Sequence, residues 1–226
     1  MRLESYLTES VYDPSIFKAI FMAGGPGSGK SYVANRTTLG HGMKIINSDT
    51  MFEKYMERAG KELDQLDITP EEFKEVTKLH NLARVITKKQ KLQYINGRLG
   101  LVIDGTGRRY EVLARQRKEL DGLGYDTYMI FVNTSLEVAQ ERNMERKRKL
   151  PPAFVEDAWT AVQGNMGKYQ NLFGSQNFIV VDNNDAGDDV FKKVWKQAKK
   201  LIKSPIKNPL GNFWISTELE KKKRLY

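Results

Sequence analysis

The stretch that decides the fold is IFKAIFMAGGPGSGKSYVANR, residues 16–36. Its first eight residues form an apolar run with a single lysine, which predicts a buried strand that ends in glycines. Residues 31–36 predict the start of a helix. Between strand and helix, residues 24–31 fit the spacing G-x-x-x-x-G-K-[ST]. Glycines in such a loop let backbone N–H groups turn inward around phosphate oxygens, and the following helix N-terminus adds a favourable dipole.

This loop predicts a nucleotide site. Lys30 is expected to reach the β- and γ-phosphates, and Ser31 is expected to hold Mg²⁺. The alternative is a glycine-rich turn with an incidental lysine, but the strand–loop–helix context favours the phosphate-binding motif. The residues expected to contact the nucleotide are Gly25, Pro26, Gly27, Ser28, Gly29, Lys30, Ser31 and Tyr32.

The rest of the chain alternates short apolar runs with longer segments of helical periodicity. Further strands are predicted at 43–47, 99–104, 128–133 and 178–182, and further helices at 49–60, 69–96, 110–123, from 135, 154–172 and 188–203. Continuous apolar strands separated by helices favour an α/β fold, the P-loop NTPase three-layer α/β/α sandwich with a mainly parallel five-stranded sheet. Ligands of such sheets bind beyond the carboxyl ends of the strands, and the polar motifs below follow predicted strands.

Composition excludes several classes of protein. The 226 residues contain no cysteine, which removes disulfides, thiol catalysis and thiolate metal sites. No apolar run reaches the roughly 18 residues of a membrane span, and the N-terminal segment lacks the apolar region of a signal peptide. We therefore expect a cytoplasmic protein without a membrane partner. Residues 191–226 carry eleven Lys or Arg against two Glu, which accounts for the whole net charge of +9.

A candidate catalytic base follows the second predicted strand. Asp49 lies in IINSDT, residues 45–50, where this fold places the strand end near the γ-phosphate. A carboxylate there accepts a proton from an attacking hydroxyl and aligns it for in-line attack. The alternative is an acidic residue in the first turn of a helix, where the helix dipole favours it. Ser48 is expected to cap that helix.

The sequence DGTGRR, residues 104–109, follows the third predicted strand. Its carboxylate, hydroxyl and guanidinium groups are suited to binding the hydroxyls and phosphates of an acceptor, or Asp104 could hold a water of Mg²⁺. The alternative is a turn with solvent-facing arginines. In the basic stretch 142–149, Arg142 and Arg146 share one helical face at i, i+4. They are candidates for arginines that close over the transferring phosphate, although a solvated basic face is the usual meaning of such a run.

Five stretches together resemble the zeta-toxin family of P-loop kinases, which is related to the polynucleotide kinases, and most of all its members encoded by large tailed phages. The resemblance runs from about residue 15 to about residue 183, and the DGTGR stretch discriminates it from other nucleotide-binding proteins. The matching stretches are GGPGSGKS (24–31), INSDTMF (46–52), VIDGTGR (102–108), GYDTYMIFV (124–132) and QERNMERKRKLP (140–151).

The resemblance implies Mg²⁺-dependent transfer of the ATP γ-phosphate to a hydroxyl. The best-known zeta toxins phosphorylate the 3′-hydroxyl of UDP-N-acetylglucosamine, so it implies a nucleotide-sugar or nucleotide-like acceptor. By position, Lys30 and Ser31 become phosphate and metal residues and Asp49 the acceptor-activating base. Asp104, Thr106 and Arg108 become acceptor contacts, and Arg142 an ATP-side lid arginine. Apart from the resemblance, Arg146 of the basic stretch is also expected to contact the nucleotide. Many family members have glutamate where this chain has Asp104.

These observations predict an N-terminal extension at 1–14, a P-loop kinase domain at 15–190, and a basic C-terminal helix and tail at 191–226. Residues 204–214 are expected to form an extended or looped segment, and His80 a packed core histidine. No antitoxin segment is visible. The tail charge favours nucleic-acid binding or ordinary solubility, which leaves a DNA or RNA kinase as one alternative. Another is a non-catalytic NTP-binding structural or regulatory module.

Overall fold

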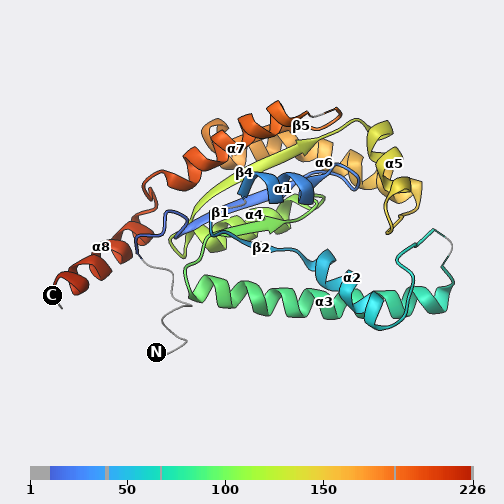
Figure 1. Ribbon diagram of the computed structural model, residues 1–226, viewed down its shortest axis with the longest axis horizontal. Helices are drawn as coiled ribbons and strands as arrows, with labels where there is room; N and C mark the ends of the chain where they lie inside the picture. The colour runs from blue at the N-terminus through green and yellow to red at the C-terminus, as the bar shows by residue number, and fades with distance from the viewer. Residues whose placement is uncertain (1–10, 39–40, 67, 186, 225–226) are drawn as a thin grey trace.

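Five parallel strands form the centre of the protein. The computed structural model describes residues 11–38, 41–66, 68–185 and 187–224. The strands are β1 (Lys18–Ala23), β2 (Lys44–Ile46), β3 (Leu101–Asp104), β4 (Asp126–Asn133) and β5 (Phe178–Asp182). They are ordered β2-β3-β1-β4-β5, and every neighbouring pair is parallel (Figure 1). The predicted five-stranded sheet is confirmed, and all of its carboxyl ends lie at one edge.

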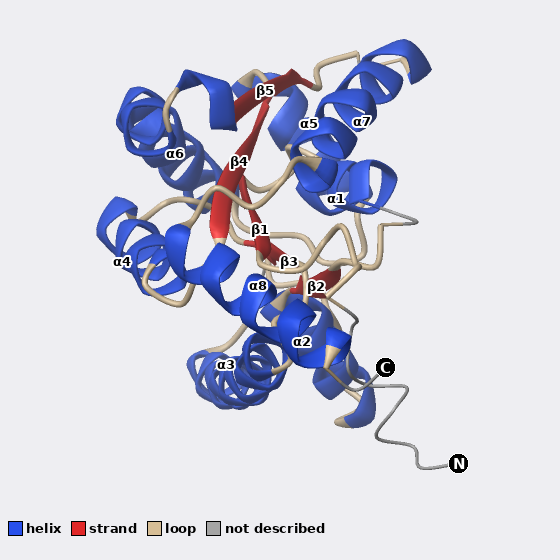
Figure 2. Cartoon of the chain, turned by 90° about the vertical axis from the view of Figure 1, so that its left-hand side faces the viewer, coloured by secondary structure: helices blue, strands red, loops and turns tan. Residues whose placement is uncertain are grey.

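Helices cover both faces of this sheet. In the described residues they are α1 (Lys30–Thr38), α2 (Ser48–Arg58), α3 (Pro70–Asn96), α4 (Tyr110–Asp121), α5 (Leu136–Glu145), α6 (Pro152–Phe173), α7 (Asp188–Lys203) and α8 (Pro209–Lys223), with a 3₁₀ turn at Ser175–Asn177. Figure 2 shows α4 and α6 on one face of the sheet and α1 and α7 on the other, with α2 and α3 beyond the β2 edge. The three-layer α/β/α architecture is therefore confirmed. No helix in the described part of the chain is long and apolar enough to cross a membrane.

The apolar run of β1 joins two cores because neighbouring side chains of a strand point to opposite faces. Phe21 belongs to the cluster under α4 and α6, together with Tyr169 and Phe173. Ile20 and Met22 belong to the cluster under α1 and α7. The strand is buried over its whole length, so after Lys18 its sequence is continuously apolar rather than alternating. This burial fixes the place of the loop that follows β1.

Helix starts follow local sequence signals with one correction. The helix predicted from residue 69 is confirmed as α3, which Thr69 caps in a full capping box with Glu72, with Pro70 in the first turn. The prediction that Ser48 caps α2 is wrong. Asn47 is the cap, because its Oδ1 accepts a 2.7 Å hydrogen bond from the backbone N–H of Asp49.

The prediction of a looped segment at 204–214 is also partly wrong. The chain is irregular only to Asn208, which caps α8 through a hydrogen bond from the backbone N–H of Leu210. Pro209 stands at the first helical position, where its missing N–H is harmless, so the proline starts a helix rather than extending a loop. Trp214 of this helix packs edge-on against Phe17 at 5.6 Å. α8 therefore lies at the amino ends of the strands, opposite the loop after β1.

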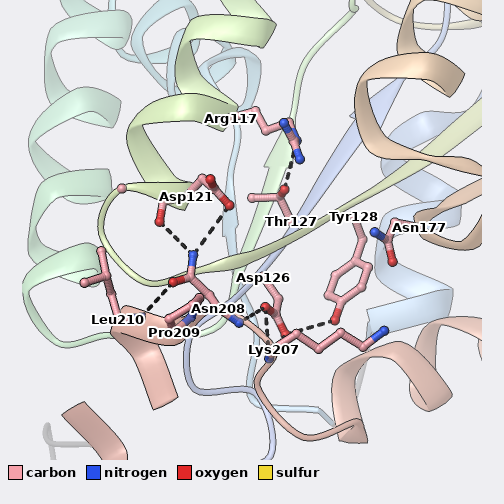
Figure 3. Close-up of a pocket in the computed structure, with 11 residues that line it drawn as sticks. Arg117, Asp121, Asp126, Thr127, Tyr128, Asn177, Lys207, Asn208, Pro209 and Leu210 are labelled. Carbon is pink, nitrogen blue, oxygen red and sulfur yellow. Dashed lines mark hydrogen bonds between the residues drawn. The ribbon is translucent and has the colours of Figure 1, made fainter. Parts of the chain in front are cut away.

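A buried ion pair joins this terminal segment to the sheet. The Lys18 side chain is fully buried, and its Nζ donates to Asp126 Oδ2 at 2.9 Å. The same carboxylate accepts backbone hydrogen bonds from Lys207 and Asn208 (Figure 3). Beside these residues a polar cavity of about 480 Å³ opens at the amino edge of the sheet. Strands β1 and β4 and the α7–α8 connection thus share one electrostatic junction.

We expect Lys18→Met to lower the free energy of unfolding by about 3 kcal/mol, because it leaves the Asp126 carboxylate buried without its cation. Urea denaturation followed by circular dichroism measures this loss. Lys193→Met, which removes an exposed lysine of α7, is the matched control and should change stability by less than about 0.5 kcal/mol. Equal effects of the two substitutions would contradict a stabilising role for the junction.

Candidate active site

The loop after β1 adopts a conformation that requires glycine at two positions. Gly27 has φ +78° and Gly29 has φ +81°, both in the left-handed region. A Cβ on Gly29 would lie 2.5 Å from Asn183 Nδ2, and one on Gly27 would lie 2.2 Å from the Ala139 carbonyl oxygen. Asn183 in turn donates a 2.7 Å hydrogen bond to the Ser28 carbonyl. The loop is therefore held between α5 and the connection that follows β5.

Lys30 is the first residue of α1, and its side chain folds back over this loop. Its Nζ donates to the Gly25 carbonyl at 2.9 Å. Burial lowers the pKa of the Lys30 ammonium, while the charges of Asp104 and Asp49 oppose that shift. The two carboxylates thus face the lysine from two other elements, which brings the predicted phosphate, metal and base residues together.

Asp104 contacts the loop residue expected to hold metal. Its Oδ2 accepts hydrogen bonds from Ser31 Oγ at 2.8 Å and from Asn47 Nδ2 at 2.7 Å. This contact arises because β3 lies next to β1, with Asp104 in register with Met22. A P-loop Ser and an Asp at the end of a neighbouring strand are the pair that holds Mg²⁺ in P-loop NTPases. Sequence reasoning left Asp104 open between acceptor and metal, and the geometry favours the metal.

Asp49 lies in the first turn of α2, with its side chain 49% exposed. Two groups from distant parts of the chain contact its Oδ1: Arg148 Nη1 at 3.1 Å and His80 Nε2 at 3.7 Å. Burial alone would raise the pKa of Asp49, but the interactions with His80 and Arg148 outweigh it and hold that pKa well below its usual range. Asp49 is therefore an ionised carboxylate at the carboxyl edge of the sheet.

The loop 105–109 is tied to both the P-loop and α6. The Thr106 carbonyl accepts a 3.1 Å hydrogen bond from the Gly24 backbone, and the Gly107 carbonyl accepts one of 2.6 Å from the Tyr169 hydroxyl. Burial raises the pKa of Tyr169, which keeps this hydroxyl a donor. The side chains of Thr106 and Arg108 are exposed, and the Arg108 guanidinium lies 5.4 Å from the centre of the Phe154 ring. A fixed backbone thus presents two polar side chains to solvent.

The other residues predicted to contact the nucleotide, Arg142, Tyr32 and Arg146, differ in what they interact with. Arg142 donates two 2.7 Å hydrogen bonds to the carbonyls of Asn183 and Asn184, so it holds the connection that supports the P-loop. Tyr32 packs against Phe191 of α7 at 5.1 Å. Burial and the charge of Arg148 lower the pKa of Arg146. The charge of Arg146 in turn acts on Lys30 and Asp49. Of the two arginines, it is Arg146 whose charge acts on the P-loop lysine.

Two residues of the site were missed from the sequence. Asn47 caps α2 with its oxygen and binds Asp104 with its nitrogen, and its position before a predicted helix could have indicated the cap. The prediction that His80 is a core residue is wrong, since it lies beside Asp49 and is 26% exposed. Only the packing of α3 against α2 brings these two residues together, so no local signal could have shown it.

A sequence profile described as AAA domain matches residues 20–167, from β1 into α6. The chain belongs to this AAA-domain family. The match includes the P-loop, Asp49, Asp104 and Arg148, so the family accounts for the segments that build the site. None of the curated proteins compared with the chain matches it.

Solved structures support the P-loop kinase-like fold. A candidate kinase of Chloroflexus aurantiacus is similar with a TM-score of 0.58 and 12% identity, over 82% of this chain and 98% of that one. A chain of the PezAT toxin–antitoxin system of Streptococcus pneumoniae gives 0.57 and 14%, over 83% and 87%. A chain of the AvrRxo1-ORF1–AvrRxo1-ORF2 complex gives 0.56 and 14%, over 84% and 67%. At these identities the likeness concerns the fold.

We expect Gly29→Ala to abolish nucleotide binding, because a Cβ at this position collides with Asn183 and its φ is unfavourable for alanine. Fluorescent ATP-analogue titration measures the loss. Gly164→Ala is the matched control, since a Cβ there meets no atom within 4 Å and alanine favours the interior of α6. Nucleotide affinity of Gly29→Ala equal to that of the control would contradict the required loop conformation.

Proposed function

We propose that this protein is an ATP- and Mg²⁺-dependent phosphotransferase that moves the γ-phosphate to a hydroxyl of a nucleotide-sugar or nucleotide-like acceptor. The observation that carries the proposal is the convergence of three groups at one edge of the sheet: the Lys30 ammonium in the P-loop, the Ser31–Asp104 pair, and the ionised Asp49 carboxylate. Phosphate binding, metal binding and acceptor activation each have a residue of suitable chemistry there.

The residues present fit both ATP and Mg²⁺. The positive φ angles of Gly27 and Gly29 turn the loop in the way that phosphate binding requires, and α1 begins directly behind it. Mg²⁺ prefers oxygen ligands, and the Ser31 hydroxyl and the Asp104 carboxylate supply two of them side by side. When bound, the metal ion would neutralise charge on the β- and γ-phosphates.

The roles of the residues follow from their positions. Lys30 binds phosphate oxygens and carries their charge through transfer. Asp49 accepts a hydrogen bond from the acceptor hydroxyl and then its proton as the new P–O bond forms and the bond to ADP breaks. Arg146 adds positive charge beside Lys30 and Asp49. Arg142 supports the P-loop through Asn183 rather than through the substrate.

The acceptor side is formed by Asp49 and the exposed side chains of Thr106 and Arg108. A hydroxyl and a guanidinium on a fixed backbone are suited to sugar hydroxyls and a diphosphate, which supports a nucleotide-like acceptor. The alternative of a DNA or RNA kinase rested on the basic tail. α8, which carries the cationic end at 221–224, lies at the amino edge of the sheet, so its charge gives that alternative no support at the acceptor side.

We expect Asp49→Asn to reduce phosphate transfer at least about 100-fold while ATP affinity changes less than twofold, because asparagine keeps the shape and loses the proton acceptor. Transfer from γ-labelled ATP is measured separately with nucleotide sugars and with DNA and RNA oligomers. Label in the first pool that the variant loses supports the proposal. Label only in the oligomers would favour the polynucleotide kinase, and ATP binding without transfer would favour the non-catalytic module.

Asp104→Asn tests the metal assignment. Asparagine can still contact Ser31 and Asn47 but lacks the negative charge that attracts Mg²⁺. We expect at least about tenfold more Mg²⁺ to be needed for half-maximal ATP binding, with nucleotide affinity at saturating Mg²⁺ changed far less. Isothermal titration with ATP over a series of Mg²⁺ concentrations measures both quantities. An unchanged Mg²⁺ requirement together with a raised KM for the acceptor would place Asp104 on the acceptor side instead.

A further inference from the structure

The two oxygens of the Asp49 carboxylate have different surroundings. Two neighbouring side chains approach Oδ1, Arg148 Nη1 at 3.1 Å and His80 Nε2 at 3.7 Å. Both of these approaches are to Oδ1, and no hydrogen bond to Oδ2 occurs within the described ranges. Half of the side chain remains exposed, so Oδ2 is the oxygen that a bound hydroxyl could reach.

A single aromatic ring fixes both groups on Oδ1. Phe52 follows Asp49 on α2 and is fully buried. The guanidinium of Arg148 lies 4.7 Å from the centre of this ring, and the imidazole of His80 meets it edge-on at 5.0 Å and 85°. A cation held against an aromatic face and a ring held edge-on are both favourable arrangements. The four side chains of Asp49, Phe52, His80 and Arg148, hereafter the Asp49 cluster, therefore form one packed unit.

The two residues that follow Arg148 are anchored to other parts of the chain. The Nζ of Lys149 binds Asp64 Oδ2 at 3.0 Å, and the Lys149 carbonyl accepts a 3.1 Å hydrogen bond from the Gln65 backbone N–H. Further along, Leu150 exchanges two hydrogen bonds with the side chain of Asn143, at 2.8 and 3.1 Å. The Arg148 side chain is only 12% exposed. These contacts suit an arginine that holds a fixed partner better than one that swings over a phosphate.

We propose that Arg148 and His80 are positioning residues that bind Oδ1 of Asp49 and so direct Oδ2 to the acceptor hydroxyl. This inference rests on the phosphotransferase function proposed above. In the step it supports, the hydroxyl oxygen bonds to the γ-phosphorus, the bond from that phosphorus to the ADP oxygen breaks, and the hydroxyl proton passes to Oδ2. Neither Arg148 nor His80 gains or loses a proton.

The charges around the cluster explain why orientation is its main effect. Asp49 faces His80 from α3 and Arg148 from the α5–α6 connection, with Lys30 of α1 and Arg146 adding positive charge. The resulting low pKa makes Asp49 a weak base. Phosphoryl transfer passes through a loose transition state in which the attacking oxygen carries little new bond, so the alignment of the hydroxyl matters more than early proton removal.

The kinetic test compares matched substitutions. We expect Arg148→Gln and His80→Leu each to lower kcat by roughly 10- to 100-fold, since a misplaced reacting group costs about that much, with ATP affinity unchanged. His80→Gln, which retains a side-chain N–H donor, should recover part of the loss. Lys147→Gln removes an exposed charge from the α5–α6 connection, and Arg84→Gln removes one from α3. Both should leave kcat unchanged. Equal kcat in Arg148→Gln and Lys147→Gln would overturn the proposal.

A second readout does not depend on transfer. Carbon-13 NMR of carboxyl-labelled protein follows the titration of Asp49, whose signal is assigned by its loss in Asp49→Asn. Arg148→Gln and His80→Leu should raise the pKa of Asp49 toward the ordinary value of about 3.9, whereas Lys147→Gln should not. An unchanged titration in both cluster variants would overturn the contacts on Oδ1. If the wild-type protein transfers no phosphate to any acceptor, the proposed function and the positioning role fail together, while the titration still decides whether the contacts exist.

Discussion

The structure of the site depends on one oxygen atom, Oδ2 of Asp104. It accepts hydrogen bonds from the helix that follows the P-loop, through Ser31, and from the residue that caps α2, through Asn47. Three segments far apart in the sequence therefore converge on the end of β3. The parallel pairing of β3 with β1 makes this possible, because it brings both carboxyl ends to the same edge. The strand order β2-β3-β1 therefore determines which side chains meet at the site.

The second feature of the site is that negatively and positively charged side chains lie near one another at the carboxyl edge of the sheet. The charges of Asp104 and Asp49 act on Lys30, and Asp49 itself is contacted by the His80 imidazole of α3 and the Arg148 guanidinium of the α5–α6 connection. Burial disfavours the charged forms of Lys30 and Asp49, and the groups around each of them oppose that effect. Removing a charge from this group is expected to shift the pKa of Lys30 or Asp49, so these residues act as an interacting group rather than as separate residues.

Local patterns predicted most of the fold. The apolar strands, the helix that begins near residue 69 and the P-loop spacing each depend on neighbouring residues, and each agrees with the structure. The residues that were misjudged depend on contacts between distant segments. His80 reads as a core residue on its own helix, and only the packing of α2 on α3 places it beside Asp49. Arg142 and Arg146 were predicted on one helical face, but α5 ends at Glu145 and leaves Arg146 outside the helix, while Arg142 binds the connection after β5. The roles of Lys30, Asp49 and Arg108 in transfer remain predictions.

The separation of the two edges of the sheet has a practical consequence for handling this protein. Helix α8 packs beside the start of β1, while the nucleotide loop follows its end, six residues away along a buried strand. Because the chain has no cysteine, a cysteine introduced at Lys223 would therefore attach the molecule to a sensor surface through α8, with the loop turned toward the solution. The same geometry allows a fluorophore on α8 to report rotational motion without entering the site.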